Sequence, residues 1–241
     1  MPLGAPTPAP AGFLDLCSRS PDDCAEPGVA LSEVRSQAQK LFWASLFDVT
    51  SQEPASVSVD GTPDRGPRFS PQFGSPAAEP QRLTRTPRHL AGNPASGSPS
   101  STPVSSAVEP RLILTKADWD RIDGVNRDIN RHIRQASDLR QYGVSDYWTE
   151  PTGRSPRGDC EDYVIAKRRA LIALGYPQSA LSIALVVTPW GEDHAVLLMA
   201  TTQGEVVLDN LAQRIVTWDR TDYTWAKRQE PGRSLAWRSI S

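Results

Sequence analysis

Residues 158–177 read GDCEDYVIAKRRALIALGYP. The stretch predicts a helix that starts at Asp159 and ends at Gly175, with Pro177 just beyond it, because glycine and proline commonly follow a helix. The charged run KRR at 167–169 is expected to form the solvated face of this helix. The residues expected on its inner face are Cys160, Tyr163, Val164, Leu171 and Leu174.

After this helix, the apolar pattern changes to the period of two that is typical of strands. The candidate strands cover residues 181–188, 194–201, 205–210, 214–218, 223–228 and 235–239. Short connections such as TTQG favour an antiparallel arrangement. Before the helix, Thr115 and Asp118 resemble a capping box that opens another helix. Two helices followed by a run of strands predict an α+β domain.

Proline is unevenly distributed along the 241 residues. Residues 51–110 contain 11 of the 22 prolines and lack Trp, Tyr and Cys. Such a segment buries too little apolar surface to offset its ordering entropy, so we expect a disordered Pro/Ser-rich insertion. The chain then divides into an N-terminal segment over 1–50, with a cysteine pair and a helix at 30–47, the insertion, and a domain over 111–241 on which the first segment packs.

The formal net charge of −2 gives no basic field, which makes a nucleic-acid binder an unfavoured class. No apolar run approaches the ~20 residues of a membrane span, so we expect no transmembrane segment. Residues 1–12 lack the basic and apolar regions of a signal peptide. They could be the head of a mature protein, or follow from a gene start placed too late.

The three cysteines fall into a close pair and an isolated residue. Cys17 and Cys24 are near enough in sequence to form a disulfide, although two free thiols in a cytosolic protein are the simpler alternative. A close pair plus one isolated cysteine favours one bridge and one reactive thiol at Cys160. A bridge would indicate an oxidising compartment.

Cys160 lies in the first turn of the predicted helix. Free N–H groups and the helix dipole there favour a thiolate and can hold an oxyanion. The alternative is a small buried core residue, since free cysteine is among the most buried residue types.

His194 and Asp209 lie on successive predicted strands. They share a face of the hairpin if its loop has an even number of residues, and an odd loop would separate them. Such a pair supplies the base and the orienting group that an activated nucleophile requires. Taken singly, His194 could be a solvated strand-end residue and Asp209 a turn residue.

The segments GDCEDYVIAKRRALIALGYP, EDHAVLLM and GEVVLDNL resemble the bacterial transglutaminase-like cysteine peptidases. This family includes periplasmic LapG-type proteases that trim surface adhesins. The resemblance continues in LTKADWDRIDGVNRDIN, YGVSDYWTEP, YTWAKRQ and the head GFLDLCSRSPDDC. It covers residues 13–47 and 111–241, whereas 51–110 does not match.

The resemblance implies a papain-like, transglutaminase-like core, in which a helix carrying the nucleophile packs on an antiparallel sheet carrying His and Asp. Cys160 matches the nucleophile, His194 the general base and Asp209 the orienting residue of an endopeptidase that forms an acyl-enzyme. Two alternatives remain: a transglutaminase-type acyltransferase with an amine acceptor, and a non-catalytic peptide-binding module.

The resemblance also implies calcium dependence, with Asp159 and Glu161 as ligands. Carboxylates beside Cys160 oppose thiolate formation, and a bound cation would relieve this conflict. Trp148 is a candidate wall of the substrate groove, with a core or rim aromatic as the alternative. The implied partners are a protein substrate, with a cell-surface adhesin as one candidate, and a membrane-bound regulator. The implied location is the periplasm.

Overall fold

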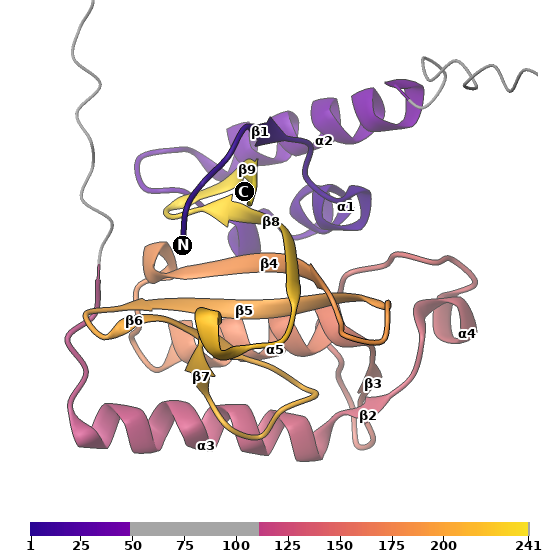
Figure 1. Cartoon of the computed structure of the whole chain (residues 1–241). Helices are drawn as coiled ribbons and strands as arrows, with labels where there is room; N and C mark the ends of the chain where they lie inside the picture. The colour runs from indigo at the N-terminus through magenta and orange to yellow at the C-terminus, as the bar shows by residue number, and fades with distance from the viewer. Residues whose placement is uncertain (49–110, 241) are drawn as a thin grey trace, which may run out of the picture. The chain divides into compact units, whose positions relative to one another are not determined.

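The computed structural model describes residues 1–48 and 111–240 (Figure 1). The expected insertion at 51–110 lies outside the described residues. The helices are α1 (Ala11–Arg19), α2 (Leu31–Asp48), α3 (Lys116–His132), α4 (Asp138–Tyr142) and α5 (Cys160–Ala173), with short 3-10 turns η1 (Pro21–Cys24), η3 (Gln178–Ala180) and η4 (Trp218–Arg220). The strands are β1 (Pro6–Thr7), β2 (Arg134–Gln135), β3 (Arg157–Gly158), β4 (Leu181–Val187), β5 (Asp193–Thr201), β6 (Gly204–Leu208), β7 (Val216–Thr217), β8 (Thr224–Glu230) and β9 (Arg233–Ser239).

Seven of the strands form one antiparallel sheet in the order β1-β9-β8-β4-β5-β6-β7. The short strands β2 and β3 form a separate parallel pair. The α+β prediction is therefore confirmed, and each predicted strand overlaps an observed one. The structure also places α4 and β3 within 138–158, a stretch between the two predicted helices in which no helix or strand was expected.

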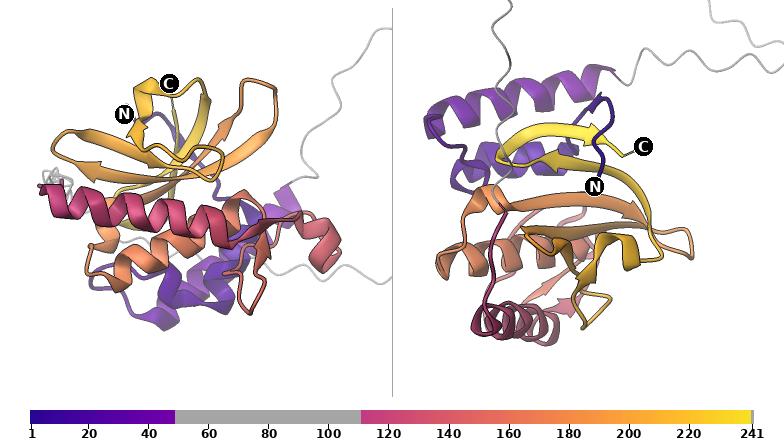
Figure 2. Two further views of the ribbon diagram at one scale, coloured as in Figure 1. Left: turned by 90° about the horizontal axis from the view of Figure 1, so that it is seen from below. Right: turned by 60° about the vertical axis from the view of Figure 1, so that its left-hand side comes forward.

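Helices α3 and α5 cover one face of the sheet (Figure 1 and Figure 2). The capping box predicted at the start of α3 is present, with reciprocal hydrogen bonds between Thr115 and Asp118. The main core joins this face to the helices, with buried residues that include Ile122, Val164, Ile165, Leu171, Ile183, Leu197 and Met199.

Two predictions about the faces of α5 are wrong. Lys167 and Arg168 are 0% and 2% exposed, whereas Leu174, expected inside, is 48% exposed. The reason is that α5 packs against the sheet, α3 and the N-terminal segment at once, so no broad face is left for water. Arg168 donates to the backbone carbonyl of Asp23, and Arg169 pairs with the Asp23 carboxylate.

The N-terminal segment belongs to the same core. Phe13 of α1 is fully buried, and its ring packs edge-on against Trp148 and Trp237 at centroid distances of 5.4 and 5.6 Å. A disulfide joins Cys17 to Cys24, as the cysteine spacing favoured. This bridge holds α1 to η1, the turn that carries Asp23.

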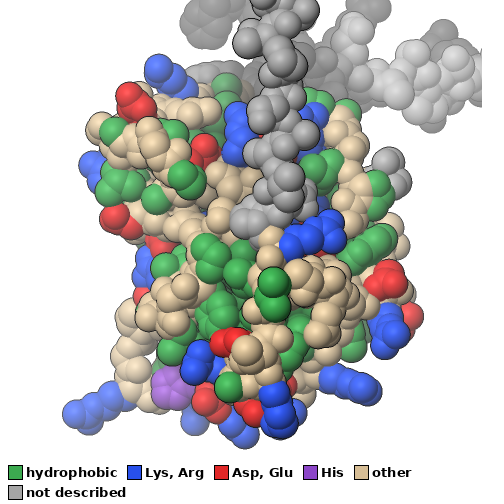
Figure 3. Space-filling view, turned by 90° about the vertical axis from the view of Figure 1, so that its left-hand side faces the viewer, with side chains coloured by type: hydrophobic (Ala, Val, Ile, Leu, Met, Phe, Trp, Pro, Cys, Tyr) green, Lys and Arg blue, Asp and Glu red, His purple; other side chains and the backbone are tan. Residues whose placement is uncertain are grey.

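The surface of the described residues mixes both signs of charge. Figure 3 shows one face on which basic and acidic side chains lie interspersed around a group of hydrophobic ones. None of the described helices combines the length and apolar character needed to cross a bilayer.

Candidate active site

Cys160 is the first residue of α5, half-buried and outside the disulfide. Its side chain lines a cavity of about 810 Å³, together with His194, Trp148, Asp159 and Glu161. The cavity therefore brings the predicted nucleophile, base, metal ligands and groove residue together.

His194 and Asp209 lie on one face of the hairpin, as expected for a loop with an even number of residues. Strands β5 and β6 pair with Thr201 opposite Gly204, so the connecting loop has the even length that places both residues on one face. The Nε2 atom of His194 lies 2.8 Å from Oδ1 of Asp209, and the two side chains are 5% and 3% exposed.

The protonation states of this pair follow from its contacts. Burial raises the pKa of Asp209, but the hydrogen bond and charge of His194, together with bonds from Tyr223 and the Leu211 amide, outweigh burial and leave it lowered. An ionised carboxylate only accepts hydrogen bonds, so Nε2 of His194 carries the proton. Its Nδ1 is then the ring nitrogen left for a proton from the nucleophile.

The Cys160 thiol is protonated in this arrangement, which differs from the thiolate expected at a helix start. Burial raises its pKa above the usual value, and Glu161 adds to the shift through its charge and through the 3.1 Å hydrogen bond from Sγ to Oε2. The backbone amide of Ala195, the residue after His194, acts in the opposite direction. Burial and the neighbouring carboxylates thus outweigh the Ala195 amide and keep the pKa of the thiol raised.

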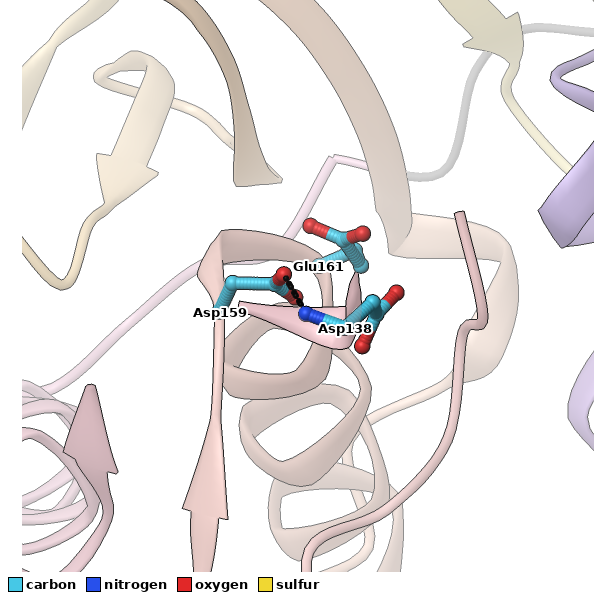
Figure 4. Close-up of side chains that lie close together, drawn as sticks. All are labelled: Asp138, Asp159 and Glu161. Carbon is cyan, nitrogen blue, oxygen red and sulfur yellow. Dashed lines mark hydrogen bonds between the residues drawn. The ribbon is translucent and has the colours of Figure 1, made fainter. Parts of the chain in front are cut away.

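Three carboxylates form a cluster beside Cys160 (Figure 4). Oxygen atoms of Asp138, Asp159 and Glu161 all lie within 4.8 Å of one another. Burial raises the pKa of Glu161 to about 8 and that of Asp138 to about 6, and the Asp159 charge adds to both shifts.

The Asp159 carboxylate does not cap its own helix but accepts the Asp138 backbone N–H at 3.0 Å. Within the described part of the chain, buried Oδ1 atoms of Asp138 and Asp159 and Oδ2 of Asp162 have no hydrogen-bond partner. Buried carboxylate oxygens that lie close together without hydrogen-bond partners suit a hard cation such as Ca²⁺.

Sequence reasoning missed two residues at this site. Asp138 is 1% exposed and comes from α4, which lies in a segment where no helix was expected. Tyr223, just before β8, donates its hydroxyl to Oδ2 of Asp209 at 2.5 Å. Neither residue has a local sequence signal, because both reach the site through tertiary packing.

Comparisons with known proteins identify the family of this chain. The model of the bacterial transglutaminase-like cysteine proteinases matches residues 97–241. The match covers more than half of the chain, and the protein belongs to this family. It has the transglutaminase-like fold that the sequence predicted. A search of curated proteins found no match.

Solved structures of Legionella pneumophila LapG are similar to this chain. The calcium-bound form is 27% identical, with 46% of this chain and 64% of that one covered and a TM-score of 0.41. The EGTA-treated form is also 27% identical, with 46% and 62% covered and a TM-score of 0.40. The chain therefore spans less than two thirds of the length of these structures.

Proposed function

We propose that this protein is an endopeptidase that cleaves a protein substrate through Cys160, His194 and Asp209. The observation that carries the proposal is the 2.8 Å contact between His194 and Asp209, at a cavity that Cys160 also lines. A nucleophile at a helix start, a base, and a group that orients the base are the parts needed for acyl transfer.

The steps follow from these positions. The Cys160 thiol gives its proton to Nδ1 of His194, and the sulfur attacks the carbonyl carbon of the scissile peptide. Backbone N–H groups at the start of α5 can stabilise the oxyanion. The intermediate then expels the amine, which takes the proton from His194 and leaves an acyl-enzyme. His194 next accepts a proton from water, whose oxygen attacks the thioester carbonyl. The carbon–sulfur bond then breaks, and the Cys160 sulfur takes this proton back from His194.

Calcium dependence is part of the proposal. Asp138, Asp159 and Glu161 would hold the ion, and its charge would favour the ionised carboxylates and make the adjacent thiolate less costly. The cluster geometry and its unsatisfied buried oxygens support this assignment. Asp138 thereby joins the two ligands that the resemblance implied.

Family membership supports a protein substrate. An adhesin substrate and a membrane-bound regulator remain proposals that rest on the resemblance to LapG-type proteases. A periplasmic location is also proposed, and the Cys17–Cys24 disulfide supports an oxidising compartment. Trp148, which is 2% exposed and lines the cavity, is proposed as a groove wall.

The test compares protein N-termini in cells that carry the wild type or Cys160→Ala. We expect new N-termini only with the wild type, because the variant lacks the nucleophile. Cleavage by the purified variant would overturn the nucleophile assignment. The product mass separates hydrolysis, which adds water to the new C-terminus, from transfer to an amine.

A further inference from the structure

Asp209 is held from several sides at once. Its Oδ1 accepts hydrogen bonds from His194 Nε2 at 2.8 Å and from the Leu211 backbone N–H at 3.0 Å. Its Oδ2 accepts the Tyr223 hydroxyl at 2.5 Å. A carboxylate that is only 3% exposed needs such donors, because an ionised group without partners is costly to bury. Tyr223 thus satisfies the oxygen that faces away from the histidine.

Tyr223 also contacts His194 directly. The tyrosine and imidazole rings meet edge-on, with centroids 5.7 Å apart and planes at 61°. One side chain therefore contacts both members of the pair, through its hydroxyl on Asp209 and through its ring on His194. These contacts restrict rotation of the carboxylate and of the imidazole together.

The sheet register explains how Tyr223 reaches this position. Val186 of β4 pairs with His194 of β5 on one side and with Trp225 of β8 on the other. Tyr223 lies two residues before Trp225, next to the N-terminal end of β8. His194 lies near the N-terminal end of β5, so both residues are at the same end of the sheet. The tyrosine therefore comes from the segment that leads into β8, which is separate from the β5–β6 hairpin that positions His194 and Asp209.

The chemistry of the hydroxyl fits a fixed donor. Burial raises the pKa of Tyr223, and the hydrogen bond to Asp209 raises it further, so the hydroxyl stays protonated at neutral pH. Since the Asp209 carboxylate is ionised and can only accept, the direction of this hydrogen bond does not change.

We infer that Tyr223 is a positioning residue, which holds Asp209 and His194 so that Nε2 of His194 stays on Asp209 and Nδ1 is left available to the nucleophile. The inference rests on the proposed function of the Cys160, His194 and Asp209 group. Tyr223 acts through this pair and does not touch the reacting atoms. Its loss should therefore lower kcat while KM changes little, because small misplacements of a base slow the chemical step.

The test is Tyr223→Phe, which removes the hydroxyl and keeps the ring. We expect kcat to fall about 10-fold or more with KM nearly unchanged. The matched control is Tyr163→Phe, which removes a buried hydroxyl that donates to the backbone carbonyl of Ile133 at 2.7 Å. This control should lose stability but keep kcat, so a loss common to both variants would argue for a merely structural role.

A second readout needs no substrate. Ring-nitrogen NMR of the chain's three histidines, recorded in the Cys160→Ala background, reports the tautomer of His194, with His89 and His132 as internal references. With Tyr223 we expect a single tautomer protonated at Nε2, and with Tyr223→Phe a mixture of tautomers. Unchanged His194 signals together with unchanged kcat would overturn the inference.

Two further experimental outcomes can be distinguished from a failure of the inference. If Tyr223→Phe does not fold, Tyr223→3-fluorotyrosine keeps the ring and provides a more acidic hydroxyl. The His194 ring-nitrogen signals must then move, and unmoved signals would contradict the inference. If the wild type cleaves no protein although the NMR change is seen, the proposed function fails while the role of Tyr223 in holding His194 stands.

Discussion

Lys167 lies fully buried on α5, and among the described residues its ammonium has no hydrogen-bond partner. Burial lowers its pKa to about 7 from an ordinary 10.5, and the charge of Asp209 partly opposes this shift. Between these two pH values the unfolded chain binds a proton that the folded chain does not. The free energy of unfolding contributed by Lys167 therefore rises with pH across this window and is least favourable below it.

Lys167→Met should for this reason raise the free energy of unfolding at pH 7 by about 2 kcal/mol, and the gain should shrink towards pH 10. Urea unfolding of the variant and the wild type at pH 7 and near pH 10 measures this difference. Lys116→Met is the control, because the Lys116 side chain is 88% exposed. A difference that does not change with pH would contradict the lowered pKa.

At the scale of elements, the start of α1 packs against a wall of the cavity that Cys160 lines. The Gly12 N–H donates to Oδ2 of Asp146 at 2.7 Å, and Oδ1 of Asp146 accepts Trp148 Nε1 at 2.6 Å. A Cβ atom at Gly12 would lie 2.5 Å from Asp146 Oδ1 and 2.6 Å from Trp148 Cδ1. The helix can approach this closely only because residue 12 has no side chain.

Gly12→Ala should consequently lower the free energy of unfolding by about 1–3 kcal/mol, because either α1 or the indole must move. It should also reduce peptidase activity, since Trp148 lines the cavity. Thermal unfolding and cleavage assays measure the two effects. Gly124→Ala in α3 is the matched control: its Cβ would meet nothing within 4 Å, so helix propensity should leave it equally or more stable. Equal effects of the two variants would rule out the close contact.

The elements differ in how far the sequence predicts them. The β5–β6 hairpin follows from its alternating pattern and two-residue loop, and a period of two then places His194 and Asp209 on one face. The flanking glycines predict where helix α5 begins and ends. They do not predict which of its side chains are exposed, because burial of Lys167 depends on the elements that pack around the helix. The roles of Asp138 and Tyr223 were likewise not predictable from the local sequence, since their contacts join segments that are distant in the chain.

At the scale of the whole molecule, the carboxylate cluster links two separate segments of the chain. Asp138 belongs to α4, and Asp159 and Glu161 belong to the start of α5. Their mutual repulsion opposes this close approach. The pKa of Cys160 is raised by burial, and the charges of Glu161 and Asp159 add to this shift. A divalent cation would oppose both effects at once. Stability and thiol reactivity should therefore respond to calcium together.

We expect calcium to raise the free energy of unfolding by about 3 kcal/mol at a concentration 100-fold above its Kd. Of the chain's three cysteines two form the disulfide, so iodoacetamide reports on Cys160 alone. Its alkylation at pH 7 should accelerate at least about 10-fold with calcium, since each unit of lowered pKa gives ten times more thiolate.

Asp138→Asn should weaken both responses, whereas Asp120→Asn on the exposed face of α3 should weaken neither. If calcium stabilised the protein but left the alkylation rate unchanged, the ion would bind without acting on the nucleophile, and the link between cluster and thiol would be wrong.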